Sequence, residues 1–177
     1  MNEQSKEKGS RPDASAEIDQ VKLQRFMQGL KDEQNLSLGF FGGLVAAIIG
    51  AIIWGIITYV TNFQIGWMAV GVGFLVGIGV RLFGKGLDTI FGIFGAVLAL
   101  FGCLAGNLLS VCIVVSRHHA MPLLDILSQL NPTIAVELMK ATFSPIDLLF
   151  YAIAVYEGYR FSFRRLKEEE VAAFAKP

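Results

Sequence analysis

The chain has 177 residues, 54% of them hydrophobic, a mean hydropathy of +0.55 and only 17% charged residues, against about 25% in soluble domains. Its 15 basic and 15 acidic residues cancel, so nothing in the net charge indicates a nucleic-acid partner. No Asp, Glu, Lys or Arg occurs in the 47 residues from Gln34 to Val80 or in the 28 from Thr89 to Ser116. Because a transmembrane helix needs roughly 20 apolar residues, these stretches predict an all-α integral membrane protein.

The N-terminal part is polar. Residues 1–15 lack any apolar period and are predicted to be a disordered cytoplasmic tail. Residues 16–36 are predicted to form an amphipathic cytoplasmic helix, which leads into the membrane, lies on its surface or docks on a partner. Its apolar residues recur at i, i+3, i+4 and i+7: Leu23, Phe26, Met27 and Leu30. No cleavable signal peptide is expected, because the first apolar run begins only near Leu38.

Residues 37–164 are predicted to form a domain of four transmembrane helices. The predicted spans are about 38–60, 65–83, 87–115 and 145–163. The short uncharged link 61–64 between the first two spans indicates a tight antiparallel hairpin. The turn Gly84-Lys85-Gly86 leads from the second span to the third.

The outer connection, residues 116–144, is predicted to contain two short helices, LLDILSQL and TIAVELMK, each near a proline that can begin a helix. The fourth span begins at Ser144-Pro145-Ile146-Asp147, a pattern typical of a capping box. It carries Glu157, which Arg160 could pair with at i+3.

The positive charges predict the orientation, because Lys and Arg concentrate in short cytoplasmic loops. With four spans and both termini inside, only Arg117 and Lys140 lie outside. The nine inner cations are Lys22, Arg25, Lys31, Arg81, Lys85, Arg160, Arg164, Arg165 and Lys167. Residues 165–177 are then a cytoplasmic tail, and the expected location is the cytoplasmic (inner) membrane.

Glycine is unusually frequent in the spans. The segment from Gly79 to Lys85 matches GxxxxGK, but a Walker A loop needs Ser or Thr next, and Gly86 stands there. Small residues instead recur at steps of three and four, which favours close helix packing in a membrane. The predicted packing residues are Gly73, Gly77, Gly92, Gly95, Ala99, Gly102 and Gly106. Whether these faces pack within one chain or between chains stays open.

Few residues in the spans could carry chemistry. Asn107, Glu157 and Arg160 are the candidates for a polar path, since polar groups are costly in lipid. Asn107 could instead hydrogen-bond across a helix interface. His118 and His119 are interpreted as interfacial residues rather than metal ligands, and Cys103 and Cys112 as small buried hydrophobes. No catalytic residue, metal or cofactor is predicted.

Three segments carry a resemblance: IGWMAVGVGFLVGIGVR, FGIFGAVLALFGCLAGNLL and SPIDLLFYAIAVYEGYRFSFR. With them, residues 36–165 resemble uncharacterised small bacterial multi-pass inner-membrane proteins. The resemblance implies a four-span layout and brings no functional residues.

The leading functional hypothesis is a non-enzymatic membrane protein that assembles through its glycine-rich faces, as a homo-oligomer or as an accessory subunit of a membrane complex. The alternative is a small ion or solute channel or transporter. A membrane enzyme comes third. The predicted partners are the lipid bilayer and other membrane-protein chains.

Overall fold

The computed structural model describes residues 14–165, whose regular structure consists of seven helices. The described residues divide into two units: residues 14–33 with Arg165 belong to one, and residues 34–164 form the other. Helix α1 (Ala14–Asp32) belongs to the first unit; in it Leu30 is buried and Phe26 half-buried. The predicted disordered tail and cytoplasmic tail lie almost wholly outside the described residues.

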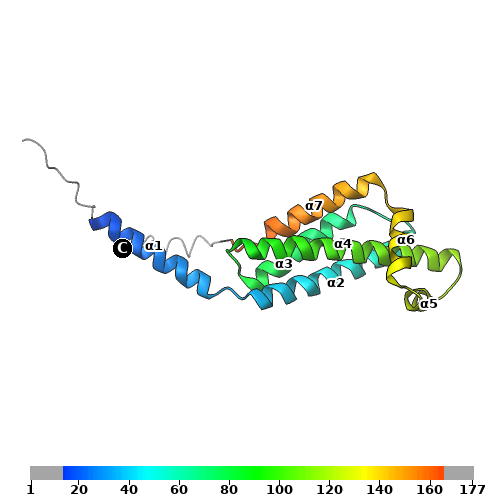
Figure 1. Cartoon of the computed structure of the whole chain (residues 1–177), viewed down its shortest axis with the longest axis horizontal. Helices are drawn as coiled ribbons and strands as arrows, with labels where there is room; N and C mark the ends of the chain where they lie inside the picture. The colour runs from blue at the N-terminus through cyan, green and yellow to red at the C-terminus, as the bar shows by residue number, and fades with distance from the viewer. Residues whose placement is uncertain (1–13, 166–177) are drawn as a thin grey trace, which may run out of the picture. The chain divides into compact units, whose positions relative to one another are not determined.

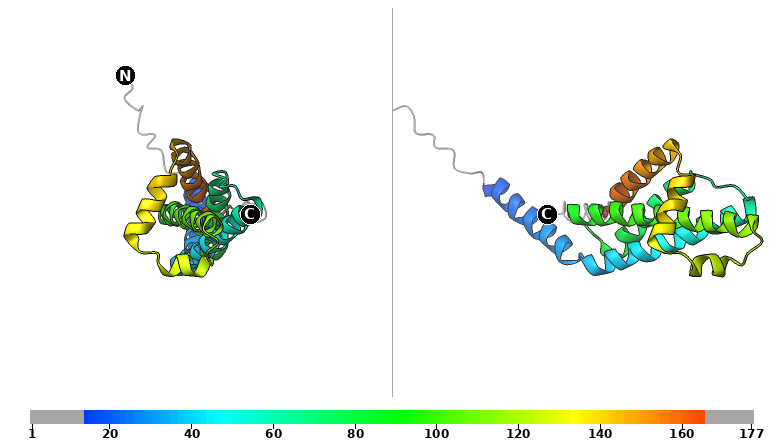
Figure 2. Two further views of the ribbon diagram at one scale, coloured as in Figure 1. Left: turned by 90° about the vertical axis from the view of Figure 1, so that its right-hand side faces the viewer. Right: turned by 45° about the vertical axis from the view of Figure 1, so that its right-hand side comes forward.

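The second unit is built on four long helices, shown in Figure 1. They are α2 (Leu36–Thr61), α3 (Met68–Gly84), α4 (Thr89–His118) and α7 (Pro145–Phe161). Helices α3 and α4 pack against each other, and both pack against α2 and α7. Helices α2 and α7 therefore lie on opposite sides of the α3–α4 pair, as the end-on view of Figure 2 shows. Each long helix begins and ends within three residues of a predicted span.

Side chains at the helix ends explain these bounds. The Asn35 Oδ1 accepts a hydrogen bond from the Leu38 N–H at 2.9 Å, which caps the start of α2. The predicted helix 16–36 therefore ends earlier, at Asp32, and a new helix starts at Leu36. At the other end of α2, Asn62 adopts the left-handed conformation with a φ of 58°, which asparagine tolerates better than most residues.

The connection between α4 and α7 contains α5 (Leu123–Ser128) and α6 (Pro132–Thr142), both of which contact α4. The Ser144 N–H donates to the Asp147 Oδ2 at 2.8 Å, as the capping-box pattern predicts. Between α6 and α7 the chain bends by 110°, so α6 runs nearly at a right angle to α7 (Figure 1).

Most buried residues of the bundle are small or β-branched, with a few large ones such as Trp54 and Phe91, while many large apolar side chains face outward. Val72, Val76 and Val80 of α3 are at most 2% exposed. On the outer faces Phe41 is 60% and Val97 59% exposed, the reverse of a soluble helical bundle. Helices α2 and α4 are each long and apolar enough to cross a membrane, and α6 with α7 would make a third crossing only as one bent span. The fold is thus all-helical and of membrane-protein type.

Candidate functional site

The predicted packing residues of α3 lie against α7. A Cβ added to Gly73 would lie 2.6 Å from the Ala154 Cα, and one added to Gly77 would lie 2.7 Å from the Phe161 Cβ. Both distances are shorter than a side chain tolerates, so the two backbones are in direct contact at these glycines.

The predicted packing residues of α4 contact mainly two neighbouring helices, α7 and α2. The first half faces α7: a Cβ on Gly92 would lie 2.7 Å from the Tyr159 ring, and Gly95 touches the Gly158 carbonyl. Ala99 is fully buried and lies against Gly158. The second half faces α2, where Gly102 meets Ala47 beside Val72 of α3, and Gly106 meets Ala51 and Trp54. All seven predicted packing residues thus contact other helices of their own chain, and assembly between chains through them stays a prediction.

The polar candidate Asn107 lies inside the bundle and is 3% exposed. Its Oδ1 accepts a hydrogen bond from the Gln64 Nε2, which belongs to the link between α2 and α3. Its Nδ2 has no partner among the described residues, and neither do the Trp54 Nε1 and the Tyr151 Oη. Asn107 therefore links α4 to the segment between α2 and α3 through its amide oxygen, while its amide nitrogen makes no hydrogen bond.

A second polar pair lies one turn further along α4. The Thr58 hydroxyl donates to the Ser110 Oγ at 2.9 Å, and both side chains are at most 1% exposed. This bond joins α2 to α4 toward the C-terminal ends of both helices. Cys103 and Cys112 are free thiols buried in the same helix.

Glu157 and Arg160 are not brought together as expected. In the part of the chain that the structure describes, no ion pair joins them; the Arg160 Nη1 instead donates to the Tyr156 Oη at 3.3 Å. The Tyr156 phenol, four residues earlier and one turn back along α7, offers the guanidinium both an oxygen and a ring face. Asn107 lies far from Glu157. Its hydrogen-bond partner Gln64 precedes the start of α3, whereas the Glu157 backbone lies against Gly77, further along α3. Nine residues of α3, roughly 14 Å, separate these levels, so the three residues form no common site.

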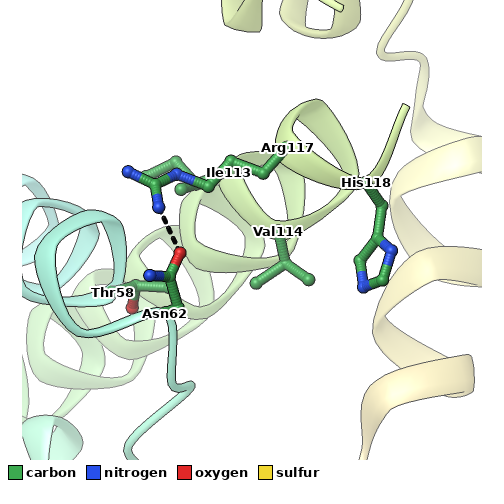
Figure 3. A pocket seen from close by; sticks show the side chains of 6 residues that line it. All are labelled: Thr58, Asn62, Ile113, Val114, Arg117 and His118. Atoms are coloured by element: carbon green, nitrogen blue, oxygen red, sulfur yellow. Dashed lines mark hydrogen bonds between the residues drawn. The ribbon is translucent and has the colours of Figure 1, made fainter. Parts of the chain in front are cut away.

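A pocket of about 210 Å³ lies where α2 and α4 end on the predicted outer side. It is lined by Thr58 and Asn62 from α2 and its cap, and by Ile113, Val114, Arg117 and His118 from α4 (Figure 3). The Arg117 Nη1 donates to the Asn62 Oδ1, and the guanidinium carbon lies 4.1 Å from the centre of the Tyr59 ring. No carboxylate lines the pocket, so its only full charge is the guanidinium.

No match was found among models of known protein families, curated proteins or solved structures. The resemblance to bacterial four-span proteins therefore stays a prediction. The described residues also contain no group of three or more His, Cys, Asp or Glu side chains that could hold a metal ion.

Sequence reasoning did not single out the pocket. It named neither Thr58 nor Ser110 as a site residue and counted Arg117 only as an outer charge. Helical spacing gives part of the answer, because Thr58 and Asn62 are four residues apart and so lie on one side of the end of α2. Arg117 and His118 likewise follow Val114 by three and four residues, which places all three on one side of α4. The spacing does not show that α2 packs against α4, and this packing brings the two sets of pocket residues together.

Proposed function

We propose that this chain is a non-enzymatic, four-span protein of the bacterial inner membrane that serves as an accessory subunit or as a homo-oligomer. The observation that carries the proposal is the backbone-to-backbone packing at the glycine faces, combined with a large apolar exterior. The chain packs its own helices together at these glycines, and assembly with other chains through the glycine faces stays a prediction beside assembly through the lipid-facing side chains.

Helix pairing supports four spans. Helices α3 and α7 have 17 residues each, about 25 Å, near the lower limit for crossing a bilayer. Helix α3 lies antiparallel along α2, because Gly50 meets Val72 and Gly39 meets Gly84. Helix α7 lies along α3 as well but runs parallel to it, because Gly73 meets Ala154 and Gly77 meets Gly158. If α2 and α4 cross the membrane, α3 and α7 lie beside them through the same depth of the bilayer.

The bend before α7 supports the same arrangement. A helix turned by 110° from α7 cannot prolong its crossing, so α6 lies along the outer interface and α7 makes the fourth span by itself. The nine inner cations against two outer ones favour cytoplasmic termini.

Single cysteines tested with a membrane-impermeant maleimide would decide the topology. Phe63→Cys and Lys140→Cys should react in intact cells, because both positions are exposed and outside. Lys85→Cys and Arg165→Cys should react only after the membrane is opened. Labelling of Arg165→Cys but not of Lys85→Cys in intact cells would show that α7 does not cross and would refute four spans.

The filled interior argues against the channel alternative for a single chain. Val72, Val76 and Ala99 are at most 2% exposed at the centre of the bundle, and the Gly73–Ala154 contact leaves no space for an ion beside them. A conduit would have to run between chains.

Native mass spectrometry after gentle extraction tests the functional proposal. A stable complex with a second polypeptide, or a homo-oligomer, is expected. A protein that stays monomeric at every concentration and carries ions across liposomes would contradict it.

A further inference from the structure

The outer pocket lined by Thr58, Asn62, Ile113, Val114, Arg117 and His118 lies at the depth of lipid headgroups, if α2 crosses the membrane as proposed above. Helix α2 has 26 residues, about 39 Å, whereas the hydrocarbon core is about 30 Å thick. The excess places its last turn, with Thr58 and the cap Asn62, in the polar part of the bilayer. The neighbouring aromatic ring of Tyr59, 57% exposed, is typical of this depth.

The pocket offers hydrogen-bond donors to an anion. A guanidinium has five N–H donors, and Arg117 makes one bond within the chain, to the Asn62 Oδ1. Contact with the Tyr59 ring fixes the plane of the guanidinium without using a donor in the pocket. Asn62 and His118 add an amide and an imidazole on the same rim (Figure 3). Phosphate oxygens match a guanidinium in two-point geometry.

The helix ends act against an anion, and their effect has to be weighed. Helices α2 and α4 both end here, and each contributes roughly half a negative charge from its last carbonyls. Two of these carbonyls are already bonded: the Asn62 N–H donates to the Thr58 oxygen at 2.9 Å and the His119 N–H to the Val115 oxygen at 3.0 Å. A direct contact with the guanidinium outweighs the remaining dipole, because a hydrogen bond to a charged group contributes more free energy than the dipole of an exposed helix end.

The other wall of the pocket is apolar. Ile113 and Val114 face the same space as Arg117, and Figure 3 shows the Val114 side chain pointing into it. At about 210 Å³ the pocket is smaller than the roughly 300–1,000 Å³ of sites for drug-sized molecules. Its size and its two-sided lining suit a group that is charged at one end and apolar at the other.

We propose that this pocket binds a phosphate group, and that the phosphate belongs to the headgroup of an anionic phospholipid. Arg117 binds the phosphate oxygens, Asn62 and His118 donate to the remaining polar atoms, and Ile113 and Val114 contact the glycerol and the first acyl carbons. The bound lipid would fix the outer ends of α2 and α4 to each other.

The test uses the full chain in nanodiscs of phosphatidylcholine with a minor fraction of phosphatidylglycerol. Native mass spectrometry counts the phosphatidylglycerol molecules that stay bound after the disc is removed. Arg117→Gln removes the charge, and Val114→Phe fills the pocket while leaving the charge in place. Lys140→Gln is the matched control, because Lys140 is the other Lys or Arg on the predicted outer side and does not line this pocket.

The wild type and Lys140→Gln should each retain one phosphatidylglycerol. Arg117→Gln should bind it about tenfold more weakly or worse, since charge-assisted hydrogen bonds contribute more than 1.4 kcal/mol. Val114→Phe should lose it as well. Retention that is equal in the wild type, Arg117→Gln and Val114→Phe would overturn the proposal.

A second arm identifies the source of the phosphate and does not depend on the topology. Inorganic phosphate is added at millimolar concentration to protein in detergent free of phospholipid. Weak phosphate binding that disappears in Arg117→Gln, together with lipid retention in discs, supports a headgroup site. Phosphate that binds alone and displaces the lipid completely would show a soluble anion as the occupant and refute the lipid assignment. Cysteine labelling, described above, reports separately whether the spans are correct.

Discussion

The contact between Gly73 and Ala154 allows a sharp test of what the glycine faces do. Replacing Gly73 with alanine adds one methyl group 2.6 Å from the Ala154 Cα, whereas ordinary contacts begin at about 3.4 Å. Helices α3 and α7 must therefore separate by at least about 0.8 Å or tilt, because the Ala154 carbonyl oxygen would lie closer still. A gap of that size forfeits a quarter to a half of the dispersion energy of the contacts around it. We expect Gly73→Ala to lower the free energy of unfolding by about 1–3 kcal/mol.

Gly71 provides the matched control on the same helix. It is exposed, and a Cβ added there would meet nothing within 4 Å. Gly71→Ala changes the backbone propensity of α3 as much as Gly73→Ala does, but it adds no clash. Its free energy of unfolding should be unchanged or higher by up to about 1 kcal/mol, because alanine favours a helix over glycine.

Steric trapping in micelles measures the free energy of unfolding, and cross-linking on the same samples measures the oligomeric state. Equal unfolding free energies for the Gly73→Ala and Gly71→Ala variants, with association lost only in Gly73→Ala, would refute the reasoning. That result would show that the Gly73 face serves contacts between chains rather than within one.

Three further predictions concern single contacts. Thr58→Val and Ser110→Ala should show a coupling of about 0.6 kcal/mol, and at most about 1.7, in a double-mutant cycle on unfolding; independent effects would mean that the hydrogen bond between α2 and α4 adds nothing. Cys103 and Cys112 should not react with maleimide until the protein unfolds, because both thiols are buried; fast labelling of the folded protein would contradict the packing around α4. Asp147→Ala should lower the free energy of unfolding by about 0.5–2 kcal/mol, because the Ser144 N–H loses its acceptor. The control Asp125→Ala in α5 should have a smaller effect, and equal effects would show that Asp147 does not act through this helix cap.

The helices themselves could be predicted from the sequence for local reasons. Uninterrupted apolar runs fix their positions, and caps such as Asn35 and Asp147 fix their ends through hydrogen bonds within three residues along the chain. The prolines at positions 132 and 145 begin α6 and α7 as their missing N–H groups predict. The spacing of the small residues also predicted which faces of α3 and α4 pack closely.

The sequence could not predict the partner of each face, because a small-residue stripe matches any helix that brings a small residue to it. Only the tertiary structure assigns Gly73 to Ala154 of α7, and divides the α4 stripe between α7 and α2. It also decides that Arg160 contacts Tyr156 instead of Glu157. The pocket at Arg117 depends on the same information, since its two walls are 51 or more residues apart in the chain and meet only because α2 and α4 pack together. Local hydrogen bonds and hydropathy determine where helices form, whereas their pairing follows from the shape of whole surfaces, which no short stretch of sequence contains.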